Sequence, residues 1–207
     1  MVKPKEKTEQ QQEDASQETG LKEPKKKREK IIVAQLREHE LIIDDHQDAR
    51  IVFDNGYYGI LNDDKSLSLN FDEALHLLER GVIKVIDENG VWLDVNDCAR
   101  IFSEREADFW TNYLVFKDLR NRGYIVGRGI SDKLKYRVYP RGGKVGKDVA
   151  KTMVCPLAEG DAISIETLDE IVKQIQSLKK RLLIACVDRL GDVSFYELQR
   201  LFNDPVN

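Results

Sequence analysis

The sequence has few of the residues that build disulfide frameworks and zinc sites. Its 207 residues include three cysteines and three histidines: Cys98, Cys155, Cys186, His39, His46 and His76. The cysteines are odd in number, lie far apart and never show Cys-x-x-Cys spacing, and all three histidines precede the last two cysteines. We therefore expect no disulfide framework, no metal site and no cofactor.

Long apolar runs are also absent. No stretch approaches the roughly 18 apolar residues that cross a bilayer, and the N-terminus lacks the apolar segment of a signal peptide. We therefore expect a soluble, cytoplasmic protein with no membrane partner. The chain is long enough for one large or two small domains once a tail is removed.

Large apolar side chains are nearly missing from residues 1–30, which alternate lysine, glutamate and glutamine. Such a segment buries too little apolar surface to repay its ordering entropy. We predict a disordered charged tail. Its basic run "KEPKKKREK" fits either a nucleic-acid arm or a solubilising tail.

Charge is strongly segregated along the chain, although the net charge is only −4. Residues 31–104 carry 6 basic against 16 acidic side chains, whereas residues 105–157 carry 12 against 5, a net +7. A local basic excess is typical of a surface that neutralises phosphates, and the alternative is ordinary solvated charge. The aromatic residues Tyr124, Tyr136 and Tyr139 lie between the cations, and nucleic-acid bases stack on such rings.

The residue pattern predicts a small N-terminal α+β domain over residues 31–104. Short apolar runs at residues 31–36 and 40–45 indicate strands, and a helix follows that ends at Asn55-Gly56. Leu67 and Leu69 alternate as in a strand, and Asn70 can cap a helix over residues 71–80. Residues 82–87 and 91–94 suggest a hairpin with its turn at Asn89-Gly90. His76 falls on the second helix, where we expect a packed or a surface residue and not a ligand.

Residues 105–207 predict a second domain with a mixed sheet of about five strands flanked by helices. Apolar residues recur at helical spacing within residues 104–123 and again within 164–181, where Ser164 can cap the helix. The expected strands cover residues 124–129, 133–140, 150–158, 182–188 and 193–198. The apolar run at 182–187 is typical of a strand buried on both faces. The expected fold class is therefore mixed α+β, with a small domain followed by a larger sheet.

Five sequence blocks in order resemble the archaeal tRNA-splicing endonucleases, also called tRNA-intron lyases. They are "NGYYG", "EALHLLERGVIKV", "YLVFKDLRNRGYIVGRGI", "YRVYPRG" and "LKKRLLIACVDRLGDVSFYEL". The resemblance covers about residues 37–203. It implies that residues 105–207 have the fold of the family's catalytic domain.

The resemblance also implies a chemistry: RNA is cut without a metal, leaving a 2′,3′-cyclic phosphate and a 5′-hydroxyl. A tyrosine takes the proton of the ribose 2′-hydroxyl, a histidine protonates the leaving oxygen and a lysine stabilises the charged intermediate. Tyr139 and Lys180 match the tyrosine and the lysine, but Val149 occupies the histidine position, or Ala150 if the alignment slips by one residue. No histidine follows His76, so we predict that Tyr139 and Lys180 are vestigial and that this chain is a noncatalytic subunit.

Each retained residue has a simpler explanation. Tyr139 can be an ordinary strand aromatic, and Lys180 can be one cation of a run at a helix end, where positive charge suits the helix dipole.

Some archaeal enzymes of the family combine a catalytic with a structural subunit. The resemblance therefore implies a catalytic homologous partner in an α2β2 heterotetramer, with precursor tRNA as the substrate. In the family an acidic loop docks into a positive pocket of the opposite subunit, and Asp188 and Asp192 supply such a loop here. The alternative is a plain turn at Gly191. The predicted RNA-contacting residues are Arg137, Arg141, Lys144 and Lys147.

Other function classes remain open at this point. A catalytically competent subunit is one, and an RNA-binding scaffold unrelated to cleavage is another. A metal-dependent nuclease would need acidic ligands beside a strand lysine, but outside the tail the only Asp-x-Lys is Asp63-Asp64-Lys65, in an expected turn.

Overall fold

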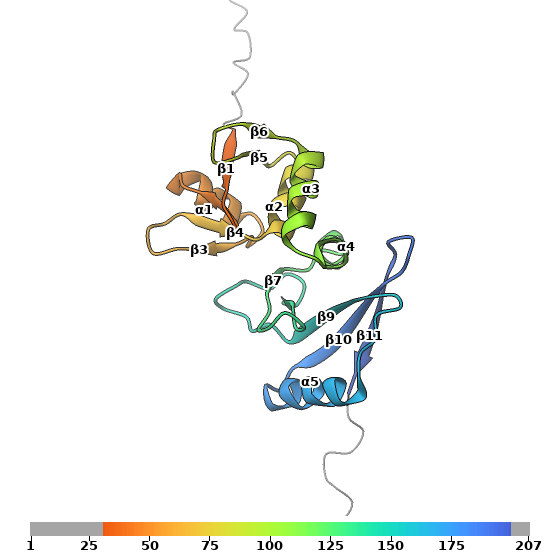
Figure 1. The fold of residues 1–207 in the computed structure, drawn as a ribbon. Helices are drawn as coiled ribbons and strands as arrows, with labels where there is room; N and C mark the ends of the chain where they lie inside the picture. The colour runs from red at the N-terminus through yellow and green to blue at the C-terminus, as the bar shows by residue number, and fades with distance from the viewer. Residues whose placement is uncertain (1–30, 200–207) are drawn as a thin grey trace, which may run out of the picture. The chain divides into compact units, whose positions relative to one another are not determined.

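Two mixed sheets and five helices are formed by residues 31–199, the part of the chain that the computed structural model describes (Figure 1). The predicted fold class is confirmed: an α+β arrangement comes first and a mixed sheet with packed helices follows. The predicted disordered tail, residues 1–30, lies outside the described residues. No helix within the described range is long and apolar enough to cross a membrane.

The N-terminal sheet has six strands in the order β3-β4-β2-β1-β5-β6. Its strands are β1 (Ile32–Leu36), β2 (Leu41–Ile43), β3 (Ile60–Leu61), β4 (Leu67–Leu69), β5 (Ile83–Ile86) and β6 (Trp92–Leu93). Strands β1 and β5 are parallel, and the other neighbours are antiparallel. In β1 and β2 buried residues alternate with half-buried ones, because successive side chains of a strand point to opposite faces.

Three helices belong to this half: α1 (His46–Asp54), α2 (Phe71–Glu79) and α3 (Val95–Arg105). The predicted Asn70 cap is confirmed, since its side chain accepts from the Glu73 amide while the Glu73 carboxylate accepts from the Asn70 amide. Helix α3 was not predicted, although Asp94 and Asp97 form the same kind of reciprocal cap. This helix buries Cys98 and Phe102, which lie four residues apart on one face, so its apolar residues follow the ordinary helical spacing.

The C-terminal half begins with α4 (Phe109–Asn121). The helix predicted over residues 104–123 was too long at its start, because residues 104–105 close α3 and the chain then turns before Phe109. The sheet that follows has the order β11-β10-β9-β8-β7. Its strands are β7 (Val126–Arg128), β8 (Tyr136–Val138), β9 (Thr152–Ala158), β10 (Arg181–Val187) and β11 (Val193–Leu198).

Helix α5 (Ile165–Ser177), capped by Ser164 as predicted, connects the parallel strands β9 and β10. Alternate residues of these strands face different partners. Met153 and Leu182 pack with α5, whereas Val154 and Ala185 belong to the core that includes α4. The two helices therefore cover opposite faces of the C-terminal sheet.

Candidate functional site

The strand register brings the three sequence-predicted family positions to one edge of the C-terminal sheet. Val138 at the end of β8 pairs with Thr152 at the start of β9, and Thr152 pairs with Arg181 at the start of β10. Because β8 is antiparallel to β9 and β9 is parallel to β10, the end of β8 meets the beginnings of the other two strands. Tyr139, Val149 and Lys180 each lie within three residues of this edge.

Tyr139 follows β8 directly and is only 7% exposed. Its amide donates to the Ile125 carbonyl over 3.0 Å, and the Arg137 guanidinium lies 6.0 Å from its ring centroid. The residue lines a cavity of about 360 Å³, which we call the Tyr139 cavity. The cavity is lined by Leu119, Arg122, Tyr124, Val138, Tyr139, Pro140, Arg141, Lys151, Thr152, Arg181, Leu183 and Phe195.

Lys180 has a different environment. Its ammonium donates to the carbonyl of Ala150, the residue after Val149. It lines a separate cavity of about 270 Å³ with residues of α5, β10 and β11, including Ile175 and Glu197. Tyr139 and Lys180 therefore share a sheet edge but not a cavity.

Val149 is 71% exposed and carries no titratable group. His76, the last histidine of the sequence, is 3% exposed on α2, between the rings of Tyr58 and Phe116. Burial and the Arg120 charge lower its pKa to about 4. Of the packed and surface positions that the sequence left open for His76, the structure shows the packed one. A neutral buried imidazole on α2 does not substitute for a proton donor at the position of Val149.

The four predicted RNA-contacting residues, Arg137, Arg141, Lys144 and Lys147, are all exposed. Arg141 stacks on Tyr124, with its guanidinium 4.8 Å from the ring centroid. Lys144 and Lys147 lie in the loop between β8 and β9, where the Asp148 carboxylate accepts from the Lys144 amide over 2.7 Å. We call these four cations the basic group; among them, Arg141 lines the Tyr139 cavity.

Some side chains counted in the basic segment have structural roles instead. Arg120 lies 3.7 Å from the Tyr58 ring centroid and donates to the Gly56 carbonyl over 2.9 Å. Lys135 pairs with Glu106, and Tyr136 is buried, so neither can meet RNA from the surface. The charge count along the sequence could not separate exposed cations from paired or buried ones, because it does not depend on which side chains are buried.

Sequence reasoning missed three cations of the Tyr139 cavity: Arg122, Lys151 and Arg181. Arg122 is paired with Asp118 at 2.6 Å, and Arg181 with Glu197 at 2.5 Å. Among residues 31–199, Lys151 and Arg141 have no carboxylate within ion-pair distance. The lysine falls inside the basic segment, so its charge was visible, but its position at the cavity follows only from the strand register.

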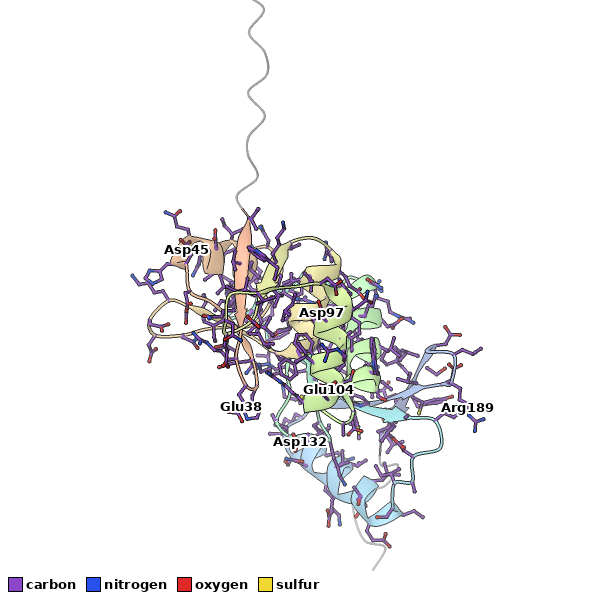
Figure 2. All side chains as sticks on the ribbon, turned by 45° about the horizontal axis from the view of Figure 1, so that its top comes forward. Glu38, Asp45, Asp97, Glu104, Asp132 and Arg189 are labelled. Carbon is purple, nitrogen blue, oxygen red and sulfur yellow. The ribbon has the colours of Figure 1, made fainter. Side chains whose placement is uncertain are left out.

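The predicted docking loop joins β10 to β11, and Arg189 lies at its tip (Figure 2). The Asp188 carboxylate accepts from the amides of Leu190 and Asp192 over 2.8 and 2.9 Å. Gly191 adopts φ +90°, which a glycine tolerates without strain. Asp188 therefore braces the turn, whereas Asp192 is exposed and Leu190 is 89% exposed.

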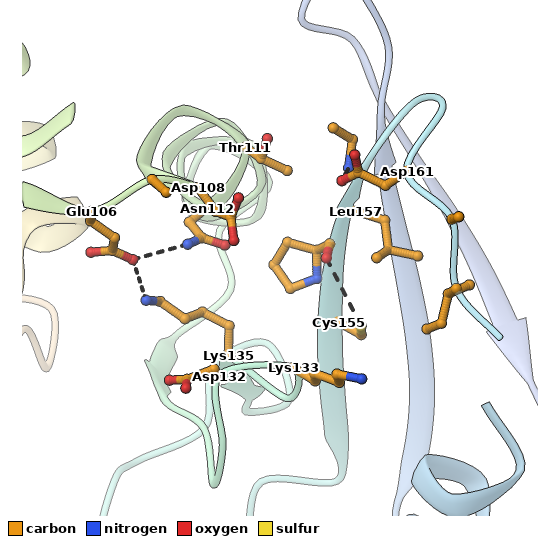
Figure 3. Close-up of a pocket in the computed structure, with 15 residues that line it drawn as sticks. Glu106, Asp108, Thr111, Asn112, Asp132, Lys133, Lys135, Cys155, Leu157 and Asp161 are labelled. Atoms are coloured by element: carbon orange, nitrogen blue, oxygen red, sulfur yellow. Dashed lines mark hydrogen bonds and ion pairs between the residues drawn. The ribbon is translucent and has the colours of Figure 1, made fainter. Parts of the chain in front are cut away.

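Another cavity, of about 660 Å³, lies between the start of α4, the segment before β8, and β9 (Figure 3). Its charged side chains are four carboxylates and two lysines: Glu106, Asp108, Asp132, Asp161, Lys133 and Lys135. Glu106 accepts from Asn112 over 3.0 Å and pairs with Lys135. This excess of negative charge makes the cavity a poor site for phosphate or for an acidic loop.

Within the described range, no group of three or more histidine, cysteine, aspartate or glutamate side chains could hold a metal ion. In the Asp63-Asp64-Lys65 segment, Asp64 accepts from the amide and the hydroxyl of Ser66 over 2.9 and 2.6 Å. This carboxylate stabilises a turn, as expected from the sequence.

Comparison with known proteins finds two matching family models. The tRNA intron endonuclease N-terminal domain matches residues 32–99, and the tRNA intron endonuclease catalytic C-terminal domain matches residues 109–195.

Similar proteins include three tRNA-splicing endonucleases. The one from Methanosarcina mazei is 36% identical over 148 residues, which are 72% of this chain but 40% of that relative. Those from Methanothermobacter thermautotrophicus and Pyrococcus horikoshii are each 32% identical over 148 residues, covering 85% and 84% of the relative. The chain thus spans about two fifths of the first relative and most of the other two.

Proposed function

Because the chain belongs to the tRNA-splicing endonuclease family, we propose that it is a structural subunit of such an enzyme and does not itself catalyse cleavage. The proposed complex removes introns from precursor tRNA without a metal, leaving 2′,3′-cyclic phosphate and 5′-hydroxyl ends. The observation that carries the proposal is that no histidine follows His76, so that the predicted histidine position holds Val149, or Ala150 if the alignment slips by one residue. A missing general acid typically slows such a reaction about 10²- to 10⁴-fold.

The surroundings of the two retained residues support a noncatalytic role. The Lys180 ammonium is bound to the Ala150 carbonyl, and Tyr139 lines a different cavity. Tyr139 and Lys180 thus line no common cavity, although Arg181 lines both. Both residues then have structural roles. Tyr139 packs at the end of β8, and Lys180 binds the loop before β9 through the Ala150 carbonyl.

In this proposal, a homologous subunit with its own tyrosine, histidine and lysine completes an α2β2 heterotetramer. The braced loop between β10 and β11 supports this assembly, because Asp188 preorganises the turn and leaves Asp192 free to meet a positive pocket. This chain's own cavity at the start of α4 is rich in carboxylates and suits an acidic loop poorly. We therefore assign the chain as the donor of the loop and its partner as the receiver.

The basic group supports contact with precursor tRNA. Arg137, Arg141, Lys144 and Lys147 are exposed and can displace counterions from the RNA backbone. Arg141 already lies on an aromatic ring, and an exposed guanidinium plane can also stack on an unpaired base.

The test mixes purified chain with intron-containing precursor tRNA in EDTA, with and without a triad-bearing homologous subunit. We expect the chain alone to bind RNA with an affinity that falls steeply as salt rises, yet to cut it little or not at all. The mixture should cut, and Tyr139→Phe in this chain should leave its rate nearly unchanged.

Three results would contradict the proposal in different ways. Cutting by the chain alone at the rate of the mixture, or loss of cutting by the Tyr139→Phe mixture, would make this chain catalytic. Cutting abolished by EDTA would indicate a metal-dependent nuclease. RNA binding without any association with the homologous subunit would favour an RNA-binding scaffold.

A further inference from the structure

A buried hydrogen-bonded group connects the two halves of the described chain. Asp72, in the first turn of α2, is 1% exposed, and Tyr136, the first residue of β8, is equally buried. The Tyr136 hydroxyl oxygen lies 2.7 Å from Asp72 Oδ2 and 2.9 Å from the Asn112 carbonyl oxygen in α4. Asp72 lies in the segment matched by the family's N-terminal domain model, whereas Asn112 and Tyr136 lie in the segment matched by its C-terminal domain model.

The hydrogens at this contact can be counted. A phenol hydroxyl has one hydrogen and a backbone carbonyl has none. Both short oxygen–oxygen contacts of Tyr136 can be full two-centre hydrogen bonds only if Asp72 supplies a second hydrogen, since otherwise the two acceptors share one. The protonated Asp72 carboxyl then donates to the Tyr136 oxygen, and the Tyr136 hydroxyl donates to the Asn112 carbonyl.

We infer that Asp72 is held protonated in the folded protein and that this proton joins α2 to β8, so that rising pH weakens the contact between the two halves. Ionised Asp72 would draw the single Tyr136 hydrogen to itself, and the bond to Asn112 would be lost. Its Oδ1 atom is buried without a hydrogen-bond partner, so the charge would be poorly solvated. This inference is independent of the proposed subunit role.

The charged groups around Asp72 are consistent with a neutral carboxyl. Burial raises the pKa of Asp72 to about 7, and the neighbouring carboxylates of Glu106 and Glu73 act in the same direction. The Tyr136 hydrogen bond and Lys135 oppose the rise, but the Lys135 ammonium is paired with Glu106. Tyr113 of α4 also faces this carboxyl, since the Asp72 charge contributes to the raised pKa of its hydroxyl.

The sign of the pH effect follows from these values. In the unfolded chain Asp72 ionises near its ordinary pKa of 3.8, whereas in the folded chain it keeps its proton to about pH 7. Its stabilising contribution is therefore complete below pH 3.8 and is lost as pH rises to about 7. Across this window each pH unit costs up to about tenfold in the folding equilibrium constant.

The experiment measures urea unfolding of the full chain from about pH 4 to about pH 8 for the wild type, Asp72→Asn and Asp63→Asn. Asparagine keeps a donor at the buried site and cannot ionise, and Asp63 provides the same substitution at an exposed carboxyl. We expect the wild type to lose stability relative to Asp72→Asn by up to about tenfold per pH unit up to about pH 7. The Asp63→Asn variant should follow the wild type.

Parallel pH curves for the wild type and Asp72→Asn would overturn the inference. A measurement on the wild type alone covers the case in which Asp72→Asn does not fold. The Asp72 side-chain carboxyl carbon can be titrated by nuclear magnetic resonance, and a midpoint near pH 7 supports the protonated state. A midpoint near or below pH 4 would show that Asp72 is ionised and would refute it.

Discussion

Val149 shows how much of the site depends on single residues. The sequence alone located this position only through the family resemblance, because a valine among polar neighbours carries no functional signal of its own. The same is true of Tyr139 and Lys180, which read as a strand aromatic and a helix-end cation. The bond from Lys180 to the Ala150 carbonyl was not predictable, since it depends on where β9 and β10 begin relative to each other.

Restoring the missing histidine should not restore the enzyme. For Val149→His we expect precursor tRNA cleavage by the chain alone to stay within about tenfold of the wild type, far below the 10²- to 10⁴-fold gain of a working general acid. The reason is that Tyr139 and Lys180 line separate cavities. Val149→Ala is the matched control, measured in EDTA. A hundredfold gain by Val149→His would show that the other two residues are competent after all.

At the scale of elements, most strands and capped helices were predictable because their signals are local. Asn70, Ser164 and the alternation at Leu67 and Leu69 each specify their element within a few residues. Helix α3 was missed although its signals are equally local, since the Asp94 cap is followed by Cys98 and Phe102 at helical spacing. The sheet order was beyond reach, since it depends on pairing between distant strands such as β1 and β5.

In the loop between β10 and β11, one aspartate stabilises the turn and another carries the charge proposed to dock. Asp188 holds the amides of Leu190 and Asp192, so reversing its charge would disturb the turn itself. Asp192→Lys leaves these backbone bonds possible and reverses only the exposed charge. We expect it to weaken association with the triad-bearing subunit by about 2 kcal/mol or more if the loop is desolvated on docking. Sedimentation of the mixture measures this effect.

Asp63→Lys is the control for that change, because it makes the same reversal at an exposed carboxylate of the N-terminal half. Equal sedimentation of the Asp192→Lys and wild-type mixtures would leave the loop as a simple turn. Equal weakening by both variants would mean that overall charge, and not the loop, drives association.

At the scale of the whole molecule, charge divides between the two halves and also between surface and interior. Carboxylates of the N-terminal half such as Asp97 and Glu104 project from α3 (Figure 2), as the acidic composition indicated. The interior groups Asp72 and His76 were not predictable as a pair with shifted pKa values, because both read as ordinary helix residues. Packing of α2 against α4 and β8 buries them together, and only the folded structure reveals that they have opposite pH responses.

His76 destabilises the folded chain on the acid side. Its pKa is lowered to about 4, first by burial and then by Arg120 and Arg80, against 6.5 in the unfolded chain. Between these values His76 is protonated in the unfolded state but not in the folded state. The free energy of unfolding therefore falls as pH drops from 6.5 to about 4. The full effect is about 3 kcal/mol by linkage.

Asp72 and His76 should therefore offset each other between about pH 4 and pH 6.5, because stability falls with rising pH through the first and rises through the second. Relative to the wild type, His76→Gln should gain stability as pH falls and Asp72→Asn should gain it as pH rises, each by up to about tenfold per unit in the folding equilibrium constant. The double variant should be as pH-dependent as the wild type. His46→Gln, at an exposed histidine, is the control for the first change. Urea unfolding of the four variants and the wild type across this range tests the pair. Parallel curves for the wild type and His76→Gln would mean that the buried imidazole takes up its proton at the same pH as in the unfolded chain, and would refute the lowered pKa.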